Sequence, residues 1–418
     1  MDRSLVHRYP RDRARWRFLA LAILFAAPVS VTAPATAEVV SARPCEDVAM
    51  SPDFSHDGTA FCAGRQGDVI GGSTSGFVLS ATTDRGHTWA RRAATGLPAT
   101  STDELIQLAV SSSFAADHTI VVQTLGSGTF VSPDAGATFV PLLPADHPRL
   151  TMFTGLPTAL PGPAAARGMA LGAGSTTSPT GAVLIDLSTH IASPVPGSPA
   201  PLRGFAVSPA YGNDGRALAF ADATVGGVRH SEAYTCDTTF SCSTRVATFA
   251  AGSVFDRAWF VSPTTLIVSV QNPDTKRRMV YASFTAGKTF APLKSAQALL
   301  DSQTAKGTTP EIDLAAGSSG RRVWLRTYGY PGLRPPASRL YVSDDGARTW
   351  RLAAYARIVE PGPRGSLPPF RTPPQRFAPR TTLQAADDGR LMFTGLSTAG
   401  WDIACSANGA KSWGTFCP

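Results

Sequence analysis

The stretch "TTDRGHTW", from Thr82 to Trp89, decides the fold, because closely similar octapeptides recur along the chain. The others are "SPDAGATF", "SFTAGKTF", "SDDGARTW" and "SANGAKSW", which begin at Ser132, Ser283, Ser343 and Ser406. An aspartate can accept hydrogen bonds from the backbone N–H groups of its own turn, and a glycine tolerates positive φ. The final aromatic residue favours a strand and burial. Each octapeptide therefore predicts a tight turn between two β-strands.

The spacing of the octapeptides predicts the number of units. The first two copies are 50 residues apart, whereas the gap from Ser132 to Ser283 is 151 residues, so two degenerate copies are expected around Asp186 and Asp237. A second recurring element, an apolar strand end followed by a turn and another strand, starts at Ser51, Ser112, Ser208 and Ser262. Four short strands per unit predict an all-β chain, a β-propeller of four-stranded blades, with seven blades and six as the alternative.

The octapeptides resemble the Asp-box, or BNR repeat, S-x-D-x-G-x-T-W, of sialidases, Asp-box xyloglucanases, sortilin-type receptors and other propellers, which are broadly WD40/YVTN-like. The resemblance covers nearly the whole chain after residue 37. It implies that the Asp-box residues are structural and that ligands bind at the opposite ends of the blades. The positions concerned are Asp84, Gly86, Trp89, Asp134, Gly136, Phe139, Asp345, Trp350, Asn408 and Trp413. The pattern is broken by Thr285 and Asn408 in place of Asp, and by Ala347 and Ala410 in place of Gly.

The N-terminus predicts export. Six arginines precede an apolar run from Phe18 to Ala27 and the small-residue site Ala35-Thr36-Ala37, which is typical of a signal peptide over residues 1–37. An uncleaved membrane anchor is the alternative. We therefore expect a single propeller domain over residues 38–418, secreted or associated with the cell envelope, monomeric, and with no further membrane span.

Charge and cysteines narrow the classes of partner. Removal of residues 1–37 takes away six Arg and two Asp and lowers the formal net charge from +8 to +4, which argues against nucleic acid. The six cysteines, an even number in an exported chain, predict disulfides. Cys236 and Cys242 are close enough to pair locally. Sequence proximity favours Cys45 with Cys62 and Cys405 with Cys417, and a bridge from Cys45 to Cys417 is the alternative. The chain has no C-x-x-C or H-x-x-x-H motif, so we expect no metal and no cofactor.

Residues 356–380 interrupt the repeat with seven prolines and five arginines. Such a segment cannot form a helix or a central strand. It is either a tolerated insertion, which we favour, or a functional lid.

Two acidic pairs stand at the expected starts of innermost strands, Asp103 with Glu104 and Glu311 with Asp313. Paired carboxylates can act as acid and base in glycoside hydrolysis, although solvated charges at strand starts are the commoner explanation. Loops between second and third strands offer Arg and aromatic groups that could bind sugars or carboxylates. The candidates are Arg229, His230, Arg277, Arg278, Tyr328, Tyr330, Arg334 and Trp401.

A sialidase is disfavoured. Sialidases carry an [FY]-R-I-P motif before the first Asp-box, whereas the only match after residue 37, Phe370-Arg371-Thr372-Pro373, has Thr for Ile and follows the fourth copy of the octapeptide. The chain also lacks a G-x-S-x-G elbow and a phosphate-binding loop. We expect a non-catalytic module that binds a glycan or protein ligand, with a glycoside hydrolase as the alternative.

Overall fold

Seven β-sheets follow one another along the described part of the chain, six of four strands and one of three. The computed structural model describes residues 45–68, 73–98, 105–111, 114–124, 127–141, 150–152, 167–172, 182–186, 191–194, 202–238, 241–304, 309–317, 319–328, 339–353, 383–386, 388–397 and 400–409. All of them belong to one compact unit, Ala37–Pro418. The predicted signal peptide and the Pro-rich segment 356–380 lie outside the described residues.

In each sheet, consecutive strands pair antiparallel in chain order. Sheet 1 comprises β1 (Asp47–Met50), β2 (Ala60–Asp68), β3 (Ser73–Thr82) and β4 (Ala90–Arg91). Sheet 2 comprises β5 (Leu105–Val110), β6 (Ile120–Thr124), β7 (Gly128–Ser132) and β8 (Val140–Pro141). Sheet 3 comprises β9 (Leu150–Met152), β10 (Arg167–Gly172), β11 (Ala182–Asp186) and β12 (Ile191–Pro194). Sheet 4 comprises β13 (Leu202–Val207), β14 (Ala217–Val225), β15 (Val228–Cys236) and β16 (Thr244–Thr248).

The remaining three sheets repeat the same order. Sheet 5 comprises β17 (Val254–Phe260), β18 (Leu266–Gln271), β19 (Arg278–Ser283) and β20 (Ala291–Pro292). Sheet 6 comprises β21 (Glu311–Ala316), β22 (Val323–Tyr328), β23 (Arg339–Ser343) and β24 (Arg351–Leu352). Sheet 7 comprises β25 (Leu383–Ala385), β26 (Leu391–Ser397) and β27 (Gly400–Ser406). Sheets 3 and 4 fill the gap in which degenerate copies of the octapeptide were expected.

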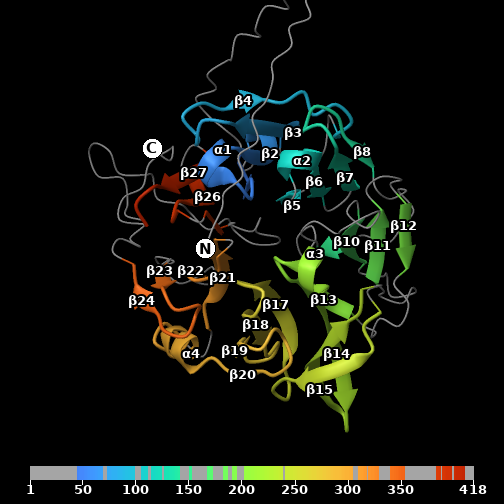
Figure 1. Ribbon diagram of the computed structural model, residues 1–418, viewed down its shortest axis with the longest axis vertical. Helices are drawn as coiled ribbons and strands as arrows, with labels where there is room; N and C mark the ends of the chain where they lie inside the picture. The colour runs from blue at the N-terminus through green and yellow to red at the C-terminus, as the bar shows by residue number, and fades with distance from the viewer. Residues whose placement is uncertain are drawn as a thin grey trace, which may run out of the picture. The chain divides into compact units, whose positions relative to one another are not determined.

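The sheets succeed one another around a ring in Figure 1. The first strands of neighbouring sheets contact each other: β1 with β5, β13 with β17, and β21 with β25. Contact between β25 and β1 brings the last sheet against the first. This arrangement is a β-propeller, as the sequence predicts. The blade count of seven stays a prediction for the whole chain, because the residues after Gly409 are not described.

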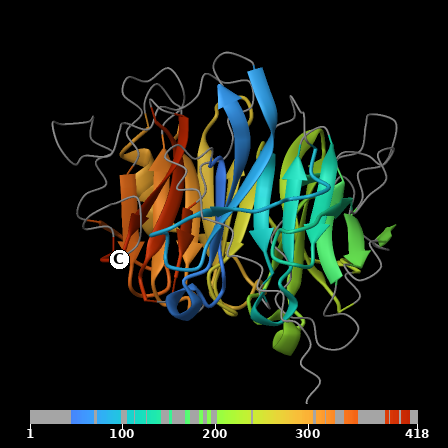
Figure 2. The same cartoon turned by 90° about the horizontal axis from the view of Figure 1, so that it is seen from above.

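One end of the sheets, which we call the turn end, carries the connections between first and second strands and between third and fourth strands. Three first-strand connections contain one-turn helices, α1 (Phe54–Asp57), α2 (Phe114–Asp117) and α3 (Tyr211–Asp214). Figure 2 shows α1, in dark blue, and α3, in light green, at the same end. The opposite end, where first strands begin and the second-to-third connections lie, is the hairpin end. The predicted turns from Ser51, Ser112 and Ser208 are therefore confirmed in position, with a helical turn added.

The helix α4 (Lys294–Asp301) was not anticipated from the sequence. It follows sheet 5, buries Ala296 and Leu300, and packs in an apolar cluster with residues of sheets 5 and 6. Because it has only eight residues, its apolar spacing is too short to stand out from the strand pattern of its neighbours.

The hydrophobic core lies between neighbouring sheets. One cluster joins sheets 1 and 2, a second joins sheets 4 and 5, a third joins sheets 5 and 6, and a fourth joins sheets 6 and 7. The cluster between sheets 7 and 1 includes Phe54, Trp89 and Met392. Burial on both faces explains why the second strands, such as β6 and β18, are almost uninterrupted runs of apolar residues.

Two predicted disulfides are present, Cys45–Cys62 and Cys236–Cys242. The alternative bridge from Cys45 to Cys417 is therefore excluded. Cys405 is also in a disulfide, and its expected partner, Cys417, lies outside the described residues. Disulfides are typical of extracellular proteins. Among the described residues, every helix is too short to cross a lipid bilayer.

Candidate functional site

The recurring aspartates of the octapeptides lie at the turn end and accept hydrogen bonds from their own turns. Asp84 accepts hydrogen bonds from the Thr88 backbone N–H (2.8 Å), the Thr88 hydroxyl (2.6 Å) and the Thr82 hydroxyl (2.7 Å). Asp134 and Asp345 accept the corresponding bonds in the turns of sheets 2 and 6. Gly86 and Gly136 each have a φ of 87°, the left-handed conformation that the sequence predicts. These carboxylates are occupied by backbone and hydroxyl donors, as expected for structural groups.

The turns that depart from the pattern keep the same geometry by other means. Thr285 replaces Asp in the sheet 5 turn, and its hydroxyl accepts a bond from the Thr289 backbone N–H (3.0 Å). Ala347 replaces Gly and adopts a φ of 75°. The Asn408 amide oxygen accepts a bond from the Ser406 hydroxyl (3.1 Å). In the degenerate sheet 4 turn, Asp237 accepts a bond from the Ser241 N–H (3.0 Å), so the third-to-fourth strand connection predicted there is confirmed.

Hydrogen bonding changes the acidity of these aspartates. The bonds from the Thr349 hydroxyl and N–H lower the pKa of Asp345 to about 2. Burial acts to raise the pKa of Asp84, but the bonds from Thr88 and Thr82 outweigh it and the pKa is lowered. A carboxyl with a lowered pKa stays ionised at neutral pH, so it cannot serve there as a general acid.

Among the described rings, Trp89 and Phe139 are buried, as predicted, whereas Trp350 is half-buried. Trp413 lies outside the described residues. A hollow of about 300 Å³ beside the sheet 1 turn is lined by His56, Asp57, Gly58, Thr83, Asp84, Arg85 and His87. Both carboxylates in this lining, Asp57 and Asp84, already accept hydrogen bonds from their own turns. Asp57 accepts them from the Ser51 hydroxyl and the Thr59 N–H.

At the hairpin end, the residues predicted for a site are only partly described. Asp103, Glu104, Tyr330 and Arg334 lie outside the described residues. Tyr328 ends β22 and Trp401 lies in β27, and for these two only the strand position is described. Arg229 and His230 are half-buried residues of β15, not loop residues, whereas Arg277 is exposed just before β19.

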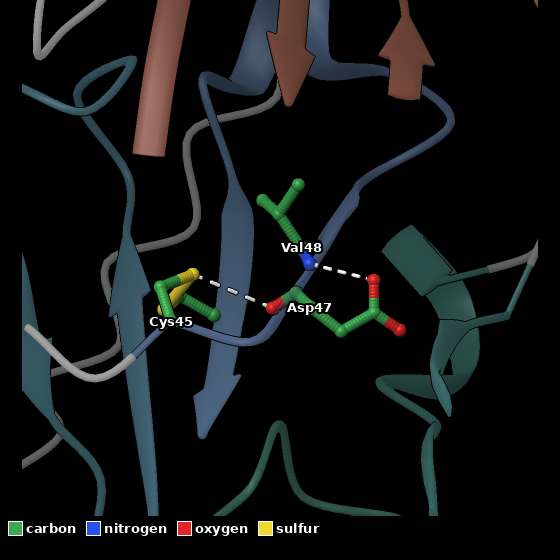
Figure 3. Close-up of a disulfide and its surroundings, with 4 residues drawn as sticks. Cys45, Asp47 and Val48 are labelled. Carbon is green, nitrogen blue, oxygen red and sulfur yellow. Dashed lines mark hydrogen bonds between the residues drawn. A yellow bond between two sulfur atoms is a disulfide. The ribbon is translucent and has the colours of Figure 1, made fainter. Parts of the chain in front are cut away.

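Asp313 binds two sheets together. Its Oδ1 accepts a bond from the Leu314 N–H (3.0 Å), and its Oδ2 accepts one from the Leu383 N–H of β25 (3.0 Å). Asp47 holds sheets 1 and 2 in the same way, through the N–H groups of Val48 (2.8 Å) and Leu108 (2.7 Å). Figure 3 shows Asp47 beside the Cys45 disulfide, with the bond from Val48 dashed.

Burial raises the pKa of Asp313, although Arg257 and the two backbone N–H groups oppose the rise. A raised carboxyl pKa is also a property of general acids in glycosidases, but both oxygens of Asp313 are taken by backbone donors. The contacts favour a connecting role. Glu311, its partner in the predicted pair, is half-buried at the start of β21.

Arg278 lies at the start of β19 and is almost fully buried. Its Nε contacts Asp256 (3.1 Å), and its Nη1 donates to the Pro310 carbonyl (2.6 Å) in the segment that leads into sheet 6. Burial acts to raise the pKa of Asp256, but Arg278 and Arg257 outweigh it and the pKa is lowered. Arg278 therefore joins sheets 5 and 6 and has little surface left for a ligand.

Two arginines of sheet 4 converge on one buried carboxylate. Arg203 Nε and Arg229 Nη2 both contact Oδ2 of Asp222, at 2.6 Å and 2.7 Å. The Asp222 side chain is 3% exposed, whereas those of Arg203 and Arg229 are 45% and 41% exposed. Oδ1 of Asp222 accepts bonds from the Ser231 hydroxyl (3.1 Å) and the Phe255 N–H of sheet 5 (3.2 Å). The buried carboxylate thus holds two partly exposed guanidinium groups in place. We call Arg203, Arg229 and Asp222 the arginine pair and its aspartate.

A different charged group occupies the other face of the same sheet. Glu232 accepts bonds from the Tyr234 hydroxyl and from Arg245 Nη1 (2.7 Å). Burial acts to raise the pKa of Glu232, but the hydrogen bonds from Tyr234 and Arg245 outweigh burial, so the pKa is lowered. Burial and the neighbouring Glu232 raise the pKa of Tyr234 to about 12, so its hydroxyl stays protonated and is a poor nucleophile.

Sequence reasoning singled out Arg229 but missed Arg203, Asp222 and Asp47. No sequence pattern marks Arg203, because a single charged residue among apolar residues of a strand forms no motif. In the structure it is the extra residue of a β-bulge, because the register of β13 on β14 shifts between Leu202 and Gly204. Within the described residues, no group of three His, Cys, Asp or Glu side chains is arranged to hold a metal ion.

Neither a protein-family profile nor a curated protein matches the sequence. Solved structures do match its fold. A chain of hydrazine synthase from Kuenenia stuttgartiensis is 14% identical, with 90% of this chain and 99% of that chain covered and a TM-score of 0.53. Oligogalacturonate lyase from Vibrio parahaemolyticus is 10% identical, with 89% and 92% covered and a TM-score of 0.52. The GH74 xyloglucanase from Xanthomonas campestris is 15% identical, with 88% and 72% covered and a TM-score of 0.45. At these identities the likeness to hydrazine synthase and oligogalacturonate lyase concerns the fold and not the activity.

Proposed function

We propose that this chain is an Asp-box propeller, exported by its N-terminal signal, that acts as a non-catalytic binding module for an extracellular glycan or protein. The ligand would bind at the hairpin end of the sheets. The octapeptide turns support the Asp-box assignment, because their aspartates, threonines and positive-φ residues recur with the same hydrogen bonds in sheets 1, 2 and 6.

The observation that carries the binding role is the state of the charged groups at the hairpin end. The described carboxylates Asp47, Asp222 and Asp313 are buried and are engaged by backbone N–H groups or arginines. Arg203 and Arg229, by contrast, are fixed at one nitrogen, and their side chains are 45% and 41% exposed. Prearranged donors suit recognition. Hydrolysis needs two carboxyls on either side of the scissile bond, and among the described residues Glu311, half-buried at the start of β21, is a candidate for that role.

A glycan array and a set of purified extracellular proteins, probed with the intact protein, would test this proposal. We expect saturable binding to at least one ligand without release of reducing sugar. Turnover of a bound glycan that is abolished by Glu311→Gln or Glu104→Gln would establish the glycoside hydrolase alternative instead. Absence of saturable binding on both sets would refute the module.

A further inference from the structure

The arginine pair and its aspartate lie at the hairpin end, where sheet 4 meets sheet 5. The Phe255 N–H of β17 donates to Asp222, and the Gly252 N–H donates to the Arg229 carbonyl (2.7 Å), so the segment that enters sheet 5 runs beside both groups. Asn272, between β18 and β19, lies against the same segment: a Cβ placed on Gly252 would be 3.0 Å from its Nδ2. The arginine pair of sheet 4 and Asn272 of sheet 5 therefore lie beside the same segment.

This surface presents hydrogen-bond donors. Each guanidinium carries five N–H donors and directs one nitrogen to Asp222, and the side chains of Arg203 and Arg229 are 45% and 41% exposed. The side-chain oxygen of Asn272 accepts bonds from the N–H groups of Asp274 (3.0 Å) and Thr275 (2.8 Å), which turns its amide nitrogen toward Gly252. Two positive charges against one negative charge leave the group with a net charge of +1.

The bulge in β13 determines where Arg203 lies. First strands of sheets 2 and 5 carry bulges near their starts as well, between Leu105 and Gln107 and between Phe255 and Arg257. In sheet 4 the inserted residue is an arginine, and a bulge can re-aim a side chain. A purely structural partner for Asp222 would not require two arginines, since Ser231 and Phe255 already satisfy its other oxygen. The second guanidinium adds charge and donors that the fold itself does not use.

We propose that Arg203 and Arg229 bind the carboxylate or sulfate group of an acidic glycan, with Asn272 as a donor to an adjacent sugar oxygen. This inference rests on the proposed binding function and names its ligand class. A fork of guanidinium donors matches the two oxygens of an anionic group, and it is held in place before the ligand arrives. The surrounding amide and the exposed hydroxyl of Thr224, on the Asp222 face of β14, suit a ring that carries hydroxyls more than an apolar peptide side chain.

The test measures binding of the intact protein to five defined polymers by biolayer interferometry. They are polygalacturonate, its full methyl ester, dextran sulfate, unmodified dextran and poly-L-glutamate. We expect binding to polygalacturonate or dextran sulfate that weakens with added salt, and at least tenfold weaker binding to the methyl ester and to dextran. Preference between the first two distinguishes carboxylate from sulfate as the recognised group.

The variants Arg203→Gln and Arg229→Gln should each weaken acidic-glycan binding about tenfold or more, and Arg203→Lys should weaken it less, because it keeps the charge without the fork. Each single variant leaves Asp222 one arginine, and circular dichroism melting would verify that the fold persists. Arg245→Gln is the matched control: it removes an exposed arginine that pairs with a buried carboxylate on the other face of sheet 4, and binding should stay within twofold.

Unchanged polyanion binding in both Gln variants, or an equal loss in Arg245→Gln, would overturn the inference. Tighter binding of poly-L-glutamate than of either acidic glycan would also overturn it and would indicate an acidic protein. If the protein binds a neutral glycan on the array and the arginine variants bind it equally well, the proposed binding function stands and the acidic-glycan site is refuted. No binding to any of the five polymers would also refute the acidic-glycan site, while the array would still decide the proposed function separately.

Discussion

Asp345→Ala should lower the free energy of unfolding by about 2 kcal/mol. The carboxylate accepts bonds from the Thr349 N–H (2.9 Å) and hydroxyl (2.6 Å), the Ser343 hydroxyl (2.8 Å) and the Arg348 N–H (3.0 Å). Because the side chain is exposed, we assign each bond about 0.5 kcal/mol, the lower end of the usual range, and four bonds give about 2 kcal/mol.

The loss should depend on pH with a defined sign. Hydrogen bonds, first that of the Thr349 hydroxyl, lower the pKa of Asp345 from 3.8 to about 2. A lowered pKa in the folded state means that the stabilisation is fully present above pH 3.8 and is lost as the pH falls toward 2. The difference between the wild type and Asp345→Ala should therefore be constant near neutral pH and should shrink between about pH 4 and pH 2.

Two further substitutions distinguish the contribution of the turn hydrogen bonds to stability from the contribution of a surface charge. Asp345→Thr copies the solution that the chain uses at Thr285, whose hydroxyl accepts the Thr289 N–H (3.0 Å), and it should cost only about half as much, about 1 kcal/mol. Asp344→Ala removes the neighbouring charge, which forms exposed ion pairs with Arg322 and Arg351, and it should cost about 0.5 kcal/mol.

Equilibrium urea unfolding, followed by tryptophan fluorescence, measures these differences. Hydrogen–deuterium exchange of residues 343–352 provides a local readout, with faster exchange expected in Asp345→Ala than in Asp344→Ala. The reasoning is refuted if the two Ala variants lose equal stability, or if the loss in Asp345→Ala persists unchanged at pH 2.

Three further sets of substitutions test the contacts within and between the sheets. Asp313→Ala should cost about 3 kcal/mol in urea unfolding, because it leaves two buried backbone N–H groups without their acceptor, and a loss below about 1 kcal/mol would refute the connecting role. Gly204→Ala should be destabilising by at least about 2 kcal/mol, since its Cβ would lie 2.2 Å from the Phe255 ring. Gly226→Ala meets open space but has a φ of 59°, so it should cost only the backbone strain of about 1 kcal/mol in the same melting experiment. Replacing both cysteines of Cys45–Cys62 by Ser should cost about 3 kcal/mol and of Cys236–Cys242 about 2.2 kcal/mol, because the paired cysteines are 17 and 6 residues apart; equal or reversed losses in urea unfolding would contradict the loop-entropy argument.

The parts of the fold that follow local rules were predictable. An aspartate, a positive-φ residue and a threonine at fixed offsets determine a turn without help from the rest of the chain, so the positions of Asp84, Asp134 and Asp345 follow from the letters alone. The local disulfide Cys236–Cys242 is predictable for the same reason. The degenerate turns were found by spacing, since a propeller must fill each gap with a whole sheet.

The candidate site was only partly predictable, because its residues come from different strands. Arg203, Asp222 and Arg229 belong to three different strands, and their meeting depends on the register of β13, β14 and β15. Asp313 also depends on a partner on another strand. Its position made it one candidate for an acid or base, and only the structure shows that the N–H of Leu383, 70 residues later, donates to its carboxylate.

The sequence by itself determined the repeated turns, the all-β class and the local cysteine pairing, because each depends on interactions within a few residues. Only the tertiary structure decided which charges connect neighbouring sheets and which remain open to solvent. The physical reason is burial: a carboxylate or guanidinium must find partners once it leaves water, and in this chain those partners lie on other strands and other sheets, as Asp47, Asp222 and Asp313 show.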